Sequence, residues 1–202
     1  AADATLLEGK QSGPNDVFTI CWTSGTEAEP KGVPRSHNHW FAISQGCVEA
    51  FLPDQDCVYL SLFPNINMGG LGAVLLPWVI TGGKIVFHHP FDLEVFLEQV
   101  SKEKIYYTLA PPALLDGLAK SPLWAATDKE SLKVIGSGSA PLSAWMIRTY
   151  QDEFGIGVIN FFASNEGVGL NSNPADFPNP EDRATYFPRF GASGFEWKSK
   201  SV

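Results

Sequence analysis

The chain has few cysteines, few basic residues and no long apolar run. Its three cysteines, Cys21, Cys47 and Cys57, include no CxxC pair, which favours reduced thiols in a cytoplasmic protein over a disulfide scaffold. Lysine and arginine number 14 against 22 aspartate and glutamate residues, which gives a formal net charge of -8 at pH 7. This balance argues against nucleic acid as a main partner, because phosphate backbones attract an excess of lysine and arginine.

The sequence also lacks the patterns of membrane and secretory segments. The longest apolar run, residues 71–80, is about half of the ~20 residues that a membrane-spanning helix needs, so it predicts a buried helix and no membrane span. Residues 1–14 have neither the basic nor the apolar region of a signal peptide. A length of 202 residues with 44% hydrophobic content predicts one domain, or one domain and a piece of another.

Short apolar runs alternate with helical stripes along most of the chain. Helices are predicted after Ser36 and Asp92, at Pro111-Pro112 and at Pro141, where capping residues or prolines precede apolar residues at helical spacing. This alternation predicts an α/β fold with a mostly parallel sheet and flanking helices, and ligands at the carboxyl ends of the strands. The predicted strands are residues 17–22, 58–63, 84–87, 105–109, 132–135 and 156–161.

The clearest motif directly follows the first predicted strand. Residues 23–33 read TSGTEAEPKGV. Hydroxyl groups, backbone N–H groups freed by glycine and a lysine are what a polyphosphate needs around it, so the run predicts a phosphate-binding loop at a strand's carboxyl end. It is not the GxxxxGK[ST] loop, because Gly25 and Gly32 are further apart than the two glycines of that motif. In addition, Val33 follows Gly32 where that motif needs Lys and then Ser or Thr. The alternative is a polar turn that happens to hold a lysine.

This run resembles the phosphate-binding loop T-S-G-T-T-G-x-P-K-G-V of adenylate-forming enzymes, which include acyl- and aryl-CoA ligases, luciferases and peptide-synthetase adenylation domains. Glu27 and Ala28 replace the usual Thr-Gly. The resemblance implies that the loop holds the β- and γ-phosphates of ATP and that Lys31 anchors the loop or neutralises charge. The matching residues are Thr23, Ser24, Gly25, Thr26, Pro30, Lys31, Gly32 and Val33.

Two later runs resemble further motifs of that family, in the family order. Residues 138–142, GSAPL, resemble the adenine-side motif G-G-A-P-L, here with Gly138, Ser139 and Ala140; the alternative is an ordinary tight turn. Residues 162–166, FASNE, resemble Y-G-x-T-E. The resemblance implies that the aromatic ring packs on adenine and that the glutamate helps to hold Mg²⁺, although such a glutamate is also typical of a solvated loop. The residues concerned are Phe162, Ala163, Asn165 and Glu166.

Other polar residues give weaker signals. Residues 60–64, LSLFP, lie where the family often has L-P-L-F-H, so Pro64 replaces a histidine on the acid side. Asn65, Asn67, Met68 and Gly69 would follow near the acid pocket, or they form a turn and a helix start. A metal site at residues 37–39, HNH, is not predicted, because no cysteine or carboxylate cluster accompanies it.

The resemblance implies a two-step ligase that uses ATP, Mg²⁺ and coenzyme A to convert a carboxylic acid, through an acyl-adenylate, into a thioester. Lys31 and Glu166 would be its catalytic residues here. Residues 1–16 are expected to form a leader, 17–167 a nucleotide-binding α/β subdomain, and 168–202 a loop-rich segment that starts an incomplete further subdomain.

Two family elements are not found: the ribose-binding Asp and the catalytic Lys of the small C-terminal lid domain. The chain therefore resembles an internal fragment of a ligase's large domain, inactive without that lid. The alternatives are a peptide-synthetase adenylation domain, a degenerate nucleotide-binding module without catalysis, and an unrelated α/β nucleotide-binding domain.

Overall fold

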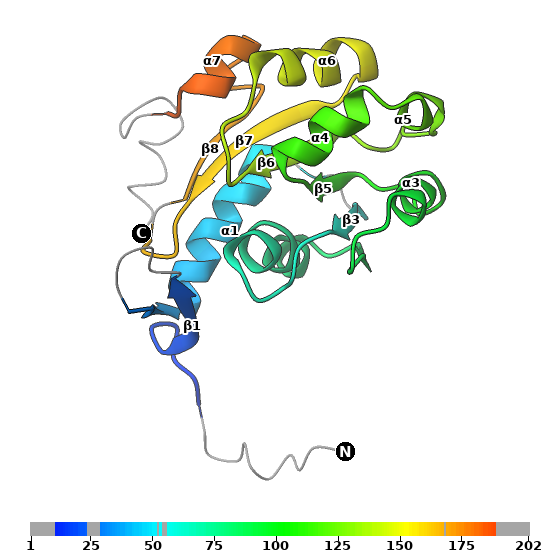
Figure 1. The fold of residues 1–202 in the computed structure, drawn as a ribbon. Helices are drawn as coiled ribbons and strands as arrows, with labels where there is room; N and C mark the ends of the chain where they lie inside the picture. Colours follow the sequence, from blue (N-terminus) through cyan, green and yellow to red (C-terminus); the bar gives the residue numbers. More distant parts are fainter. Residues whose placement is uncertain (1–10, 24–28, 52, 54–55, 168, 189–202) are drawn as a thin grey trace.

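The computed structural model describes residues 11–23, 29–51, 53, 56–167 and 169–188. Its main feature is a six-stranded sheet in the order β4-β3-β5-β6-β7-β8 (Figure 1). All neighbouring strands in it are parallel except β8, which runs antiparallel to β7. The predicted α/β fold is thereby confirmed. The strands are β3 Val58–Ser61, β4 Lys84–Phe87, β5 Tyr107–Leu109, β6 Val134–Gly138, β7 Gly157–Ala163 and β8 Gly169–Ser172.

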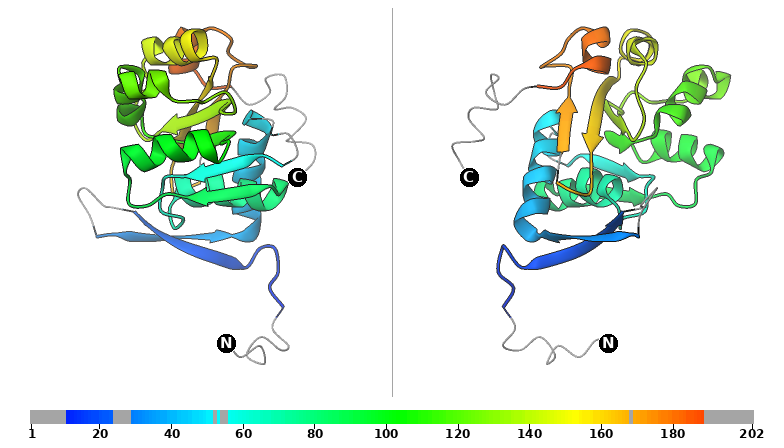
Figure 2. Two further views of the ribbon diagram at one scale, coloured as in Figure 1. Left: turned by 90° about the vertical axis from the view of Figure 1, so that its right-hand side faces the viewer. Right: turned by 60° about the vertical axis from the view of Figure 1, so that its left-hand side comes forward.

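Helices cover both faces of this sheet (Figure 2). Alternating side chains along each strand point to opposite faces, so that Leu60 and Val158 join one apolar cluster while Tyr59 and Ile159 join another. The first cluster contains α3 Leu93–Lys102, α4 Pro112–Ala119, α5 Pro122–Ala126 and α6 Ala144–Phe154, and the second contains α1 His37–Phe51 and the π-helix η2 Met68–Leu75.

Local capping explains where these helices begin. The Asp92 side chain accepts a hydrogen bond from the Val95 amide at 3.0 Å, so α3 begins as predicted. Pro112 is the first residue of α4, where its missing N–H costs nothing. The predicted helix start at Pro141 is wrong: the Ser143 hydroxyl accepts from the Met146 amide at 3.2 Å, and α6 therefore begins at Ala144.

The predicted helix at residues 71–80 is present in two parts. The η2 segment is followed directly by α2 Leu76–Thr81, and its residues 70–74 are buried. Asn67 caps η2, because its side-chain oxygen accepts from the Gly70 amide at 2.8 Å. A Cβ on Gly70 would lie 2.3 Å from the Pro64 carbonyl oxygen, so only glycine fits this turn. None of the described helices is long and apolar enough to cross a membrane.

The first predicted strand does not belong to the main sheet. Strand β1 Val17–Thr23 pairs antiparallel with β2 Lys31–Ser36 as a separate two-stranded sheet (Figure 2). The expectation that the phosphate loop follows a strand of the parallel sheet is therefore wrong. We call the β1–β2 pair the hairpin. Trp22 is 68% exposed on it.

Residues 169–185 add one more strand to the same sheet and one more helix beside it. Strand β8 adds its antiparallel edge, and α7 Pro180–Thr185 packs against α6. The Asn160 side chain, at the end of the buried part of β7, donates to the carbonyl oxygens of Arg183 at 3.0 Å and Ala184 at 3.2 Å. Neither element shows an apolar stripe in the sequence, and both were missed.

Candidate active site

A cavity of about 460 Å³ lies at the carboxyl ends of β5, β6 and β7. Helix α1 and η2 line its other side, and the β8 strand closes one edge, where the Asn171 side chain donates to the Gly46 carbonyl oxygen at 3.3 Å. This is the edge at which an open parallel sheet binds its ligands. Its lining includes five residues of the two later motifs: Gly138, Ser139, Phe162, Ala163 and Asn165.

The turn after β6 allows little change in its side chains. A Cβ on Gly138 would lie 2.3 Å from the Phe161 carbonyl oxygen on the neighbouring strand. Ser139 has a φ of 68°, a left-handed conformation that places it in a tight turn. The Ser137 hydroxyl donates to the Ala110 carbonyl oxygen at 2.8 Å and so joins the ends of β6 and β5. The backbone is therefore fixed and open to close approach by a flat ligand, while Ala140 is exposed and does not line the cavity.

The end of β7 places an aromatic ring at the cavity. Phe162 is 53% exposed, and its ring lies 6.2 Å from that of Phe187, measured between centroids. An exposed ring of this kind offers a face on which a base could stack. Asn165 lines the cavity a short distance further along, while Glu166 is exposed and lies outside the lining.

A buried arginine connects the hairpin to the loop that follows β7. Arg35, on β2, is 3% exposed. Its Nη2 donates to the carbonyl oxygens of Ser164 and Asn165, both at 2.8 Å, and its Nε donates to Asn165 at 3.2 Å. Burial lowers the pKa of Arg35, and nearby Cys21 and Glu166 oppose that shift. Sequence reasoning missed this residue, because no local pattern links it to a loop 130 residues away.

The predicted phosphate loop is described only at its two ends. Ser24, Gly25 and Thr26 lie outside the described residues. Thr23 ends β1 and its hydroxyl donates to the Lys31 carbonyl oxygen at 3.5 Å, while Lys31 and Gly32 begin β2 and are exposed. Thus the structure groups one set of predicted residues in the cavity and another on the hairpin, and Arg35 links the two.

The interior of the cavity is largely apolar. Asn67, Met68 and Gly69 line it, whereas Asn65 turns away and accepts a hydrogen bond from Ser61 at 3.0 Å. The remaining lining, which the sequence did not reveal, includes Ile43, Gly46, Cys47, Gly72, Leu109 and Leu170. Burial raises the pKa of the Cys47 thiol to about 12, so this thiol is neutral and lines the cavity without acting as a nucleophile.

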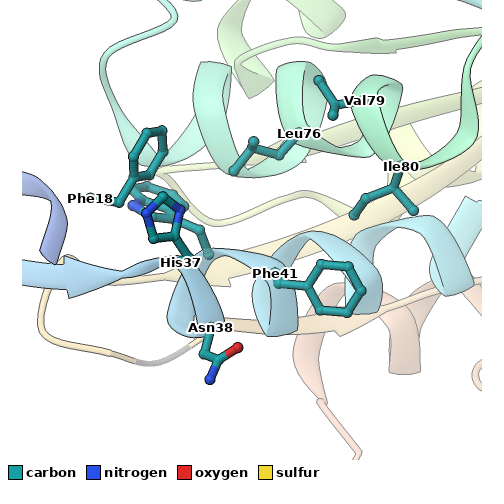
Figure 3. A pocket seen from close by; sticks show the side chains of 8 residues that line it. Phe18, His37, Asn38, Phe41, Leu76, Val79 and Ile80 are labelled. Carbon is teal, nitrogen blue, oxygen red and sulfur yellow. The ribbon is translucent and has the colours of Figure 1, made fainter. Parts of the chain in front are cut away.

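A second apolar cavity, of about 490 Å³, lies between β1, α1 and α2 (Figure 3). Phe41, Leu76 and Ile80 line it, together with His37. The His37 ring stacks on Phe18 with centroids 4.9 Å apart and its Nε2 lies 3.1 Å from the Ser12 hydroxyl. No group of three or more His, Cys, Asp or Glu side chains that could hold a metal occurs in the described part of the chain. None of the predicted site residues lines this second cavity.

The residues present suit Mg²⁺ and a nucleotide. Mg²⁺ commonly binds through one or two carboxylates together with substrate phosphates and water, so it needs no all-protein cage. Glu166 supplies one exposed carboxylate directly after Asn165, which lines the cavity, while Glu166 itself lies outside that lining.

Comparison with known proteins identifies the class that this fold and site define. The chain belongs to the AMP-binding enzyme family, which it matches over residues 2–195. It is 29% identical over 170 residues to indoleacetate–CoA ligase of Aromatoleum aromaticum, covering 82% of this chain and 33% of that relative. It is 33% identical over 147 residues to 4-coumarate–CoA ligase 3 of Oryza sativa subsp. japonica, covering 70% of this chain and 26% of that relative.

The fold matches solved structures as well. The inhibitor-bound N-terminal domain of FACL13 from Mycobacterium tuberculosis superposes with a TM-score of 0.79 and 22% identity, over 90% of this chain and 46% of that one. The chain spans between about a quarter and a third of the length of the curated relatives that it matches.

Proposed function

We propose that the protein carrying this chain is an AMP-forming acid–CoA ligase. The observation that carries the proposal is the cavity at the strand ends, where the turn of Gly138 and Ser139 meets the loop of Phe162 and Asn165. Membership of the AMP-binding family supports it, as do relatives named as CoA ligases.

In the first half-reaction a carboxylate oxygen attacks the α-phosphorus of ATP, and pyrophosphate leaves with the electrons of the broken P–O bond. Phe162 would stack on the adenine, and the open backbone at Gly138 would let the base approach closely. The hairpin would hold the departing phosphates through the hydroxyl groups and amides of its loop. Its proposed phosphate-binding residues are Thr23, Ser24, Gly25, Thr26, Lys31 and Gly32.

Charge control dominates such a step, because negative charge accumulates between the attacking and leaving oxygens. Lys31 would neutralise part of this charge, and Glu166 would hold Mg²⁺, which offsets more of it when bound. In the second half-reaction the sulfur of coenzyme A attacks the acyl carbon and AMP leaves, which forms the thioester. Other parts of the parent protein, a C-terminal lid domain among them, would complete the site.

The lining of the cavity suggests an apolar acid with a flat ring. Ile43, Leu109 and Leu170 offer hydrocarbon surface, and Gly46, where a Cβ would meet no atom within 4 Å, leaves room for a ring beside α1. Indoleacetate and 4-coumarate, the acids in the names of two relatives, are of this kind. A cytoplasmic location fits the three free, buried cysteines.

Acid-dependent exchange of labelled pyrophosphate into ATP tests the proposal. The full-length gene product would be assayed with aryl, fatty and small acids, beside Lys31→Ala and Glu166→Ala. Lys102→Ala, an exposed change on α3, is the control. We expect exchange with aryl acids, its loss in both site variants and its retention in the control. A folded protein without exchange for any acid would instead indicate a degenerate nucleotide-binding module.

A further inference from the structure

We infer that Arg35 is a positioning residue that holds the loop of Ser164, Asn165 and Glu166 at a set place relative to the hairpin. The inference rests on the proposed function, because it assigns Arg35 the task of bringing the two halves of the nucleotide site together. Its basis is the three hydrogen bonds from one buried guanidinium to two consecutive carbonyl groups.

The guanidinium is itself held on the hairpin side. Its carbon lies 5.3 Å from the centroid of the Trp40 ring, a cation–π distance. The Trp40 indole N–H donates to the Thr19 hydroxyl on β1 at 2.8 Å. These contacts restrict the conformation of the Arg35 side chain. They also couple the position of both hairpin strands to the position of the loop.

The loop carries groups that need an exact place. The Ser164 carbonyl oxygen that accepts from Arg35 also accepts from the Gly167 amide at 3.3 Å, which closes a turn around Asn165 and Glu166. Asn165 lines the cavity, and Glu166 is the proposed Mg²⁺ ligand. Because arginine presents a rigid planar fork of donors, it holds the two carbonyl groups in one fixed geometry, whereas the ammonium of lysine, on a flexible stem, sets their positions less exactly.

The chain offers a matched control in Arg183. This arginine is also buried, at 1% exposure, and also donates to backbone carbonyl groups, those of Phe177 at 2.8 Å and Pro178 at 2.9 Å. It lies on α7, outside the lining of both cavities. A purely structural loss on removing a buried arginine should therefore be similar in the two places.

The test compares Arg35→Met, Arg35→Lys and Arg183→Met in the full-length gene product. For Arg35→Met we expect the Mg²⁺ concentration for half-maximal pyrophosphate exchange and the KM for MgATP to rise roughly tenfold, as lost hydrogen bonds to a charged group would give. The KM for the acid should change little, and Arg35→Lys should recover part of the effect. Arg183→Met should leave all three values near those of the wild type.

Hydrogen exchange supplies a readout that does not depend on activity. We expect faster amide exchange in residues 161–167 of Arg35→Met, and in residues 174–185 of Arg183→Met. Wild-type Mg²⁺ dependence in Arg35→Met, or equal losses in both arginine variants, would overturn the inference. Should Arg35→Met not fold, Arg35→Lys carries the same test.

Absence of pyrophosphate exchange in the wild-type protein with every acid would refute the proposed function. The role of Arg35 would then be judged by the affinity for MgATP and by hydrogen exchange of residues 161–167. Unchanged values of both in Arg35→Met would refute that role separately.

Discussion

The carboxyl edge of the main sheet and the hairpin hold the two halves of the proposed site by different means. At the sheet edge, close backbone contacts decide the geometry, as at Gly138 beside Phe161. The hairpin, in contrast, leaves Val17, Ile20 and Trp22 between 58% and 68% exposed. A two-stranded sheet is barely stable by itself, so a small number of anchoring contacts must set its place. Adding an atom to the backbone of the sheet half should therefore destabilise the protein. The position of the hairpin half should instead depend on a few single side chains.

The largest effect is expected at the main anchor of the hairpin. Trp40 is 1% exposed, packs with Cys21 of β1 and Leu71 of η2, and bonds to Thr19. Trp40→Ala should cost about 4 kcal/mol of unfolding free energy, in the range for buried tryptophan, measured by urea denaturation. Trp22→Ala, on the exposed face of the same hairpin, should change stability by less than about 0.5 kcal/mol. Similar losses in both variants would show that the hairpin does not depend on this anchor.

A somewhat smaller effect is expected at the sheet edge. Gly138→Ala places a methyl group 2.3 Å from the backbone oxygen of Phe161, so β6 and β7 must separate. We expect a loss of about 3 kcal/mol in unfolding free energy by urea denaturation, together with weaker MgATP binding. Gly117→Ala is the control, because a Cβ there, within α4, meets no atom within 4 Å. It should stabilise the protein by about 0.5 kcal/mol, since alanine is the better helix former. A neutral Gly138→Ala would contradict the idea of a rigid edge.

The same contrast explains what the sequence could predict. The α/β fold, the cap at Asp92 and the proline start of α4 follow from local chemistry, because each signal lies within a few residues of its effect. The residues at the ends of β6 and β7 were singled out by their resemblance to two family motifs, each of which begins at the end of an apolar strand. The strand itself places them at the sheet edge, so their position in the fold could be inferred, while their roles stay a prediction.

The hairpin and its anchor could not be inferred in this way. Residues 17–22 look like any apolar strand, and only the partner strand decides between a parallel and an antiparallel neighbour. That partner, β2, holds a lysine, a proline and an arginine, and does not resemble a strand in its composition. The β8 strand, GLNS, is similarly polar. The role of Arg35 depends on a contact with distant backbone, which no sequence window contains.

The smallest expected effect is on the pH dependence of the unfolding free energy, and it concerns Cys47 in the cavity wall. Burial raises the pKa of Cys47 from an ordinary value of 9.0 to about 12, so the unfolded chain releases this proton first as pH rises. The stabilisation by the neutral thiol is complete below pH 9 and is lost progressively as the pH rises to about 12. Between pH 9 and 10.5 this loss lowers the unfolding free energy by about 2 kcal/mol. Cys47→Ala and Cys47→Ser remove this titration. Both variants should therefore show a flatter decline of unfolding free energy than the wild type in that range, measured by urea denaturation at each pH. An unchanged slope would mean that water reaches Cys47, and that the α1 wall of the cavity is as open as the hairpin surface.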